Sequence, residues 1–181
     1  MYPILRLALE RHRARRLPPL GPGEMHVTRT RCWPLDLDPW MELNNGRTLS
    51  LFDLGRVALG ERSGLPAALA RHGWRLSVAG SSVRYRRRVV AFDRLEIRSA
   101  ILGCDRRFFY VHQAMLREGE PTSSVLIRSA ISGPGGIVPT DAVRAALGWS
   151  GWNPALPPWV AAWAEADALR PWPPDLPAEA S

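Results

Sequence analysis

The longest periodic segment of the chain runs from Glu42 to Ser63. Its apolar residues recur at intervals of three and four, which predicts a helix with one broad apolar face; they are Leu43, Leu51, Leu54, Ala58 and Leu59, with Phe52 and Val57 beside them. Asn44 or Asn45 is a suitable N-cap, and Gly64 a suitable terminator. Because apolar residues cover more than half of the circumference, we expect the rest of the fold to wrap around this helix.

Segments of alternating polarity or high β-branched and aromatic content predict strands at 26–32, 76–89, 95–102, 107–117 and 124–132. Shorter helices are expected over 66–72 and from Thr140 or Asp141 onward. A strand, a long buried helix and then hairpin-connected strands predict an α+β fold, with an antiparallel sheet curled around the helix. The strict alternation of strands and helices that a Rossmann-type fold requires is missing.

The two ends of the chain differ from its middle. Residues 1–23 predict a short amphipathic, basic helix that PPLGPG breaks. Residues 149–181 are rich in Pro and Trp and predict an irregular wrap or tail. We therefore expect one domain over 24–148. The N-terminal helix is expected to pack on the body or on a partner subunit; peripheral contact with a membrane is the alternative.

Composition narrows the class of protein only modestly. The 181 residues suit a single core, and the net charge of +7 favours anionic partners: nucleic acid, an acidic membrane or a phosphorylated small molecule. Cys32 and Cys104 form no metal-ligand spacing and are expected to be buried thiols, with one disulfide as the alternative. Without an apolar run of about 18 residues or a secretory signal, a cytoplasmic location is expected.

The segment DLDPWMELNNGR, Asp36 to Arg47, concentrates polar chemistry at the start of the long helix. Asp36, Asp38 and Glu42 are typical helix-start residues, so capping is one interpretation. The other is an active site, because unpaired N–H groups at a helix N-terminus stabilise a developing oxyanion and a nearby carboxylate attacks or accepts a proton.

This segment, with the buried helix and the strands after it, resembles the hotdog-fold thioesterases, in particular the 4-hydroxybenzoyl-CoA thioesterase branch with its D-x-D-x-x-G-H-V-N-N pattern. The resemblance runs from about His26 to Ser132. It implies hydrolysis of an acyl-CoA, with Asp38 as nucleophile or general base and backbone N–H groups around Met41 to Asn45 polarising the carbonyl. It also implies a homodimer or a dimer of dimers with pockets between subunits. Neither a metal nor a cofactor beyond the substrate's coenzyme A is expected.

Two positions depart from that pattern: Met41 replaces the common Gly, and Glu42 the common His. Glu42 adds a negative charge beside Asp38, either as a second catalytic group or as a helix-start carboxylate. Asn45 is assigned to the catalytic group and Asn44 to substrate binding, with capping as the alternative for both. The departures keep open a second function, a non-catalytic acyl-CoA- or lipid-binding protein.

The basic strand candidate SVRYRRRV, 82–89, offers cations for phosphate groups. If it is extended, Arg84, Arg86 and Arg88 share one face, and Arg84 and Arg86 are our candidates for binding coenzyme A. RNA binding and a merely solvated edge are the alternatives; since no RNP-like sequence is present, we expect no nucleic-acid partner. Trp40, with Trp33, is expected to line the acyl pocket or the core.

Overall fold

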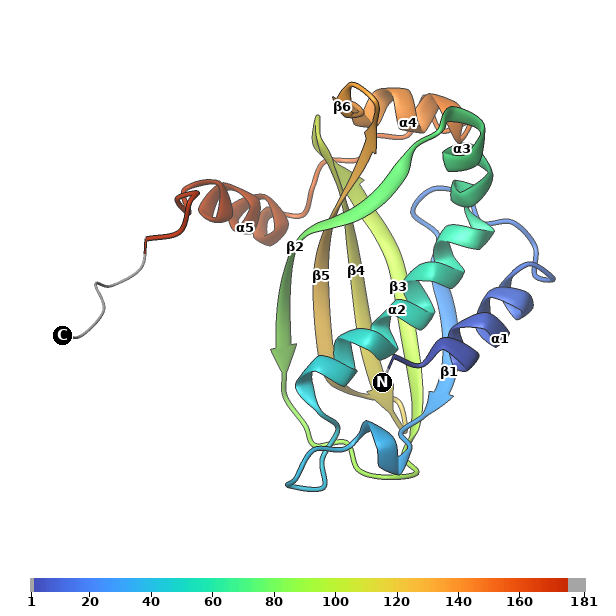
Figure 1. Ribbon diagram of the computed structural model, residues 1–181, viewed down its shortest axis with the longest axis vertical. Coiled ribbons are helices and arrows are strands. Elements are labelled where there is room, and N and C mark those ends of the chain that lie inside the picture. Colours follow the sequence, from blue (N-terminus) through green and yellow to red (C-terminus); the bar gives the residue numbers. More distant parts are fainter. Residues whose placement is uncertain (1, 176–181) are drawn as a thin grey trace.

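The computed structural model describes residues 2–175, in which one curled antiparallel sheet covers a central helix (Figure 1). The helices are α1 (Ile4–Ala14), the 3-10 turn η1 (Pro34–Asp36), α2 (Asn45–Arg62), α3 (Leu65–His72), α4 (Thr140–Ala146) and α5 (Pro158–Ala168). The strands are β1 (His26–Arg31), β2 (Arg75–Tyr85), β3 (Arg94–Cys104), β4 (Phe108–Arg117), β5 (Glu120–Gly133) and β6 (Gly136–Ile137). The predicted α+β architecture is confirmed.

The strands are hydrogen-bonded in the order β1-β3-β4-β5-β2, with β6 on β5. All neighbouring pairs are antiparallel. Strand β2 follows the central helix in sequence but lies at the far end of this order. Its outer edge therefore has no strand partner in the described part of the chain.

The core lies between α2 and the concave face of the sheet. Phe52 and Leu51 of α2 are fully buried against Ile97, Met115 and Val125 of the strands. Strand β3 alternates buried and accessible residues from Leu95 to Ala100, as the period of two predicts.

Helix α2 approaches the sheet closely at Gly55. A Cβ there would lie 2.5 Å from Ser99 Oγ and 2.9 Å from a side-chain carbon of Ile97, so only glycine fits. Beside this contact, buried Gln113 donates one hydrogen bond of 2.8 Å to the carbonyl of Phe52 and another to Ser99. Because a buried polar group must be paired, this bridge fixes the position of α2 over β3 and β4.

Helix α1 covers α2 from the other side. Leu7 packs on the main core, and Arg11 forms an ion pair of 2.6 Å with Glu61 of α2. The outward residues Leu5 and Leu9 are exposed. Contact of this helix with a membrane surface stays a prediction. No helix among residues 2–175 is long and apolar enough to span a membrane.

Two predictions of secondary structure are wrong. Strand β2 ends at Tyr85 instead of Val89, because Arg86 and Arg87 both direct their backbone N–H to the carbonyl of Thr122 and so interrupt the ladder. The C-terminal segment is not an irregular tail throughout, since α5 lies within it; residues 176–181 of that segment are outside the described residues. Both cysteines are free and buried.

Candidate active site at the start of the central helix

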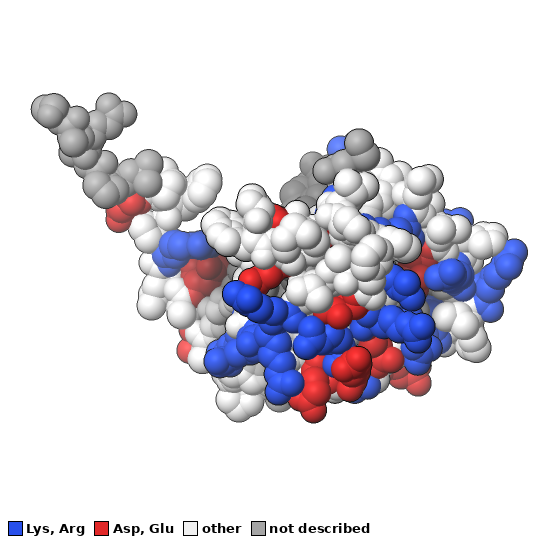
Figure 2. All heavy atoms as spheres, turned by 90° about the horizontal axis from the view of Figure 1, so that it is seen from below, with Lys and Arg blue, Asp and Glu red and all other residues white. Residues whose placement is uncertain are grey.

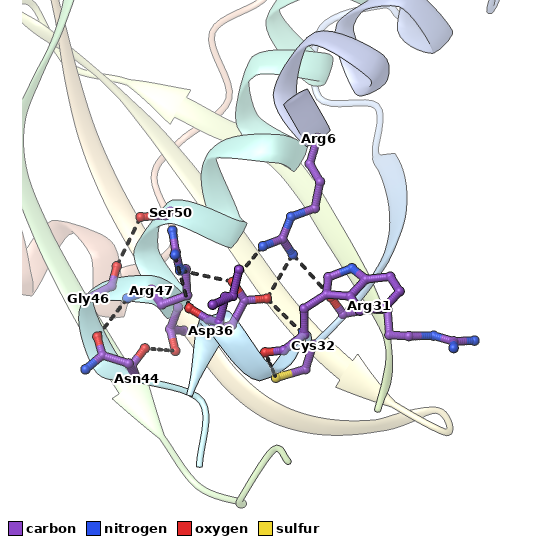
Figure 3. Close-up of polar contacts among 11 residues, drawn as sticks. Arg6, Arg31, Cys32, Asp36, Asn44, Gly46, Arg47 and Ser50 are labelled. Atoms are coloured by element: carbon purple, nitrogen blue, oxygen red, sulfur yellow. Dashed lines mark hydrogen bonds and ion pairs between the residues drawn. The ribbon is translucent and has the colours of Figure 1, made fainter. Parts of the chain in front are cut away.

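Asp36, the first carboxylate of the D-x-D pair, is fully buried and is a structural residue. Arg6 of α1 binds both of its oxygens, at 2.6 and 2.9 Å, and the Nε of Arg47 lies 3.0 Å from Oδ1 (Figure 3). The backbone N–H of Trp33 donates a further hydrogen bond of 2.9 Å. These contacts join α1, η1 and α2, and they leave no side of Asp36 open for a substrate.

The thiol of Cys32 lies close to this cluster. Burial above all, and then the negative charges of Asp36 and Asp93, raise the pKa of Cys32 to about 11. The thiol is therefore protonated at neutral pH and is a poor nucleophile, since the thiolate is the reactive form.

Asp38 stands on a short hairpin-like loop before α2. Its backbone N–H donates to the carbonyl of Glu42 at 2.8 Å, and Leu37 and Leu43 form the neighbouring bridge. Its Oδ1 accepts hydrogen bonds from the backbone N–H groups of Trp40 and Glu42, at 2.9 and 3.2 Å. Within residues 2–175, Oδ2 receives no hydrogen bond. The side chain is half-buried, so one carboxylate oxygen is oriented by the loop while the other is available.

The tip of the same loop carries the departures from the thioesterase pattern. Met41 has a φ of 60°, in the left-handed region that favours glycine. A glycine at this position in the pattern thus has a conformational reason, and the loop adopts the same kind of turn with methionine. Trp40 and Met41 are 78% and 65% exposed. Trp33 is 45% exposed, so neither tryptophan is a core residue, contrary to that part of our expectation. Trp33 does line a cavity, together with Arg6 of α1 and Arg31 of β1. A role of either tryptophan in an acyl pocket stays a prediction.

The N-terminus of α2 offers two free backbone donors. Asn44 is the N-cap, and its Oδ1 accepts from the N–H of Arg47 at 3.1 Å. Asn44 therefore has the capping role. The N–H groups of Asn45 and Gly46 have no hydrogen-bond partner in the described part of the chain, as expected for a helix start. Gly46 was missed by the sequence reasoning, although a glycine directly after two asparagines was a usable signal for an open helix end.

Arginines gather beside this helix start. Arg86, Arg87 and Arg88 line one cavity of about 280 Å³ together with Glu42 and Asn45. Seen from below, a band of arginines crosses this end of the molecule next to an uncharged area (Figure 2).

Two of these three arginines have acidic partners. Arg88 pairs with Glu42 at 2.8 Å, and Arg87 pairs with Glu120 at 3.1 Å. The side chain of Arg86 has no acidic partner among residues 2–175.

Arg84 lies elsewhere, which corrects its assignment with Arg86 to one face. Because the strand ends at Tyr85, side chains no longer alternate between the two faces of the sheet after that residue. The three following arginines therefore line the same cavity, although their positions would alternate in a continued strand. Arg84 is still within β2 and lines a cavity with Trp159 and Trp163 of α5. From the run 82–89 we selected Arg84 and Arg86, whereas the cavity beside the helix start is lined by Arg86, Arg87 and Arg88.

An apolar cavity of about 150 Å³ lies under the C-terminal half of α2. Its lining comes from α2, α3, the sheet and α4 and includes Val57, Gly60, Leu69, Leu76, Ile131 and Leu147. Val57 is twelve residues beyond Asn45, about 18 Å along the helix axis. Within one chain, this cavity is therefore distant from Asp38.

Comparisons with known proteins agree with this architecture. Residues 32–164 match the family model of the thioesterase-like superfamily. The chain is 35% identical over 96 residues to Protein THEM6 of Xenopus laevis, covering 53% of this chain and 46% of that protein. It thus spans about half the length of the curated relatives it matches.

Solved structures share the fold at low identity. The probable thioesterase YbaW of Escherichia coli superposes with a TM-score of 0.64 at 21% identity, over 68% of this chain and 97% of that one. The 1,4-dihydroxy-2-naphthoyl-CoA thioesterase Slr0204 of Synechocystis superposes with a TM-score of 0.60 at 11% identity, over 69% and 96%. Together with the family match over most of its length, this identifies the chain as a hotdog-fold member of the thioesterase-like superfamily.

Proposed function

We propose that this protein hydrolyses an acyl-coenzyme A to the free acid and coenzyme A. The main support is the start of α2, where the unpaired N–H groups of Asn45 and Gly46 adjoin a loop that orients Asp38 and leaves one of its oxygens available. The membership of the superfamily agrees with this chemistry.

In the proposed reaction the thioester carbonyl oxygen accepts hydrogen bonds from the N–H groups of Asn45 and Gly46. The positive end of the helix dipole and these two donors stabilise the negative charge that develops on that oxygen. Asp38 either attacks the carbonyl carbon, giving an anhydride that water then cleaves, or removes a proton from the attacking water. The C–S bond breaks, the thiolate leaves and takes up one proton, and the acyl group gains the hydroxyl of water.

Coenzyme A would bind through its phosphates to the arginine-lined cavity beside this helix start. Arg86 is the best placed of the three arginines, since Arg87 and Arg88 already pair with carboxylates. Glu42 in turn is bound by Arg88, so a charge-neutralising role suits it better than a direct catalytic one.

We further propose that two copies join through their β2 edges. Leu76 and Val78 of this strand are 43% and 52% exposed, which is unusual for apolar residues on the core-facing side of a sheet. A two-fold axis through paired β2 strands makes the two α2 helices antiparallel. The apolar cavity of one subunit then approaches Asp38 of the partner subunit and would take the acyl chain.

The expected molar mass in solution is therefore twice 20.2 kDa. In Val78→Arg, the new arginine lies near the same arginine of the second subunit, across the two-fold axis. Repulsion between the two charges should prevent pairing, so light scattering should give the mass of a monomer. Val90→Arg makes the same change at a comparably exposed position in the β2–β3 loop and should stay dimeric. A wild-type monomer at micromolar concentration would contradict the proposed pairing.

Gly60→Leu should narrow the range of acyl chains. A Cβ at Gly60 has Leu65 as its nearest neighbour at 3.7 Å, so a side chain is accommodated locally and extends into the apolar cavity. We expect kcat/KM to fall about tenfold or more for the longest chains that the unaltered protein accepts, and little for acetyl-CoA.

The measurement is thiol release from a panel of acyl-CoAs of increasing length. Ala67→Leu adds the same side chain on the exposed side of α3 and serves as control. If kcat/KM depends on acyl-chain length in Gly60→Leu as it does in the unaltered protein, the apolar cavity does not hold the acyl chain. Binding of acyl-CoA without any thiol release from the unaltered protein would favour the non-catalytic binding function instead.

A further inference from the structure

Helix α5 covers part of the convex face of the sheet, on the side opposite α2 (Figure 1). Val160 is fully buried against Tyr110 and Leu126, which alternate in their strands with the residues of the main core. Asp167 of α5 forms an ion pair of 2.6 Å with Arg128 of β5. The helix is therefore fixed on the sheet by both apolar and charged contacts.

Between α5 and the sheet lies a cavity of about 510 Å³, which we name the outer cleft. Its floor is set by the strand register: Ser82, Leu126 and His112 are cross-strand neighbours, and Arg84 and Ser124 form the adjacent pair. Neighbouring strands lie about 4.8 Å apart, so these side chains share one small area of the convex face.

Two indoles form the wall of the outer cleft. Trp163 lies close to β2 at Gly80, where a Cβ would be 3.3 Å from its ring. Trp159 is half-exposed and meets the ring of His112 edge-on, with centroids 5.3 Å apart. The cleft thus combines flat aromatic surface with polar groups.

The polar side chains of the outer cleft have no polar partner in the described part of the chain. Within residues 2–175, the side chains of Ser82, Arg84, His112 and Ser124 form no hydrogen bond or ion pair, whereas Arg128 on the same face is paired. Burial lowers the pKa of His112, so its ring is neutral at pH 7 and offers one donor and one acceptor. Arg84 is then the one charged side chain in the described lining.

Convergent unpaired polar groups in an aromatic-walled cavity are typical of a ligand site. We propose that the outer cleft binds a planar aromatic carboxylate, with Arg84 pairing the carboxylate and Trp159 contacting the ring. The serine hydroxyls and the imidazole donate further hydrogen bonds. Because the cleft lies on the opposite face of the sheet from the start of α2, this site is independent of the proposed thioester chemistry.

The test is calorimetric titration of the 181-residue chain with 2-naphthoate, a planar aromatic carboxylate. We expect one saturable site per chain. Arg84→Gln should weaken binding about tenfold to a hundredfold, the worth of charge-assisted hydrogen bonds. Trp159→Ala should weaken it about two- to tenfold. The uncharged analogue 2-naphthamide should bind the unaltered protein and Arg84→Gln equally weakly.

Two control variants distinguish the outer cleft from other places. Arg75→Gln removes an exposed arginine at the other end of β2 and should leave naphthoate affinity unchanged. Gly60→Leu fills the apolar cavity under α2 and should also leave it unchanged. Absence of saturable binding, equal affinity in Arg84→Gln and the unaltered protein, or loss of binding in Gly60→Leu would each overturn the proposal.

Discussion

Replacing Asp38 with Asn is expected to lower the rate of thioester cleavage about 10²- to 10⁴-fold, the usual range for loss of a positioned catalytic base. The substitution changes charge and basicity but little else. The amide oxygen of Asn remains able to accept the hydrogen bonds that Trp40 and Glu42 donate to Oδ1. The loop before α2 should therefore keep its conformation, and the loss should appear in kcat rather than in folding.

The measurement is single-turnover and steady-state release of coenzyme A, with thermal unfolding recorded for the same samples. Glu42→Gln is the matched control, because it removes a carboxylate of the same loop that is already paired with Arg88. We expect its effect on kcat to be much smaller than that of Asp38→Asn. Unchanged turnover in a folded Asp38→Asn protein would remove Asp38 from the proposed mechanism.

The sequence was sufficient for those parts of the fold that short-range patterns encode. The α2 helix follows from its apolar spacing and from the capping residue Asn44, and β3 follows from its alternation. The end of β2 was not predictable, because Arg86 and Arg87 share one acceptor, Thr122, that lies more than thirty residues away.

Helix α5 was missed for a different reason. Its sequence PWVAAWAEADA is apolar nearly all round, and prolines precede it, so the composition favours an irregular tail over an amphipathic helix. Contacts with the convex face of the sheet explain its position: Val160 is buried there, and Asp167 pairs with Arg128 of β5.

The candidate site shows the same limit more sharply. Asp36 and Asp38 are separated by one leucine, and capping was a plausible role for either. Their environments are opposite, because Arg6 reaches Asp36 from α1, thirty residues earlier in the chain. Local sequence does not encode that contact. The motif thus indicated the candidate site, but only the tertiary structure shows that Asp36 is buried and paired whereas Asp38 keeps one oxygen without a hydrogen bond among residues 2–175.

Asp36→Ala is therefore expected to lower the free energy of unfolding, whereas Asp38→Asn is expected to lower the rate of thioester cleavage. Removing the buried carboxylate leaves the guanidinium groups of Arg6 and Arg47 without their shared counter-ion and the N–H of Trp33 without its acceptor. Breaking one side of a buried ion pair typically costs about 3–5 kcal/mol, since the remaining charge stays desolvated. Helix α1 should detach first, because Arg6 joins it to the start of α2.

Urea unfolding measures this loss as a lower midpoint, and hydrogen exchange locates it. Asp93→Asn is the matched control: its ion pair with Arg117 is partly exposed, at 3.0 Å, and should be worth at most about 1 kcal/mol. The amides of α1 are expected to exchange faster in Asp36→Ala and to keep their protection in Asp93→Asn. If both variants unfold at the same urea concentration, Asp36 does not join α1 to the domain. In that case the two carboxylates of the motif would have to be compared again as catalytic candidates.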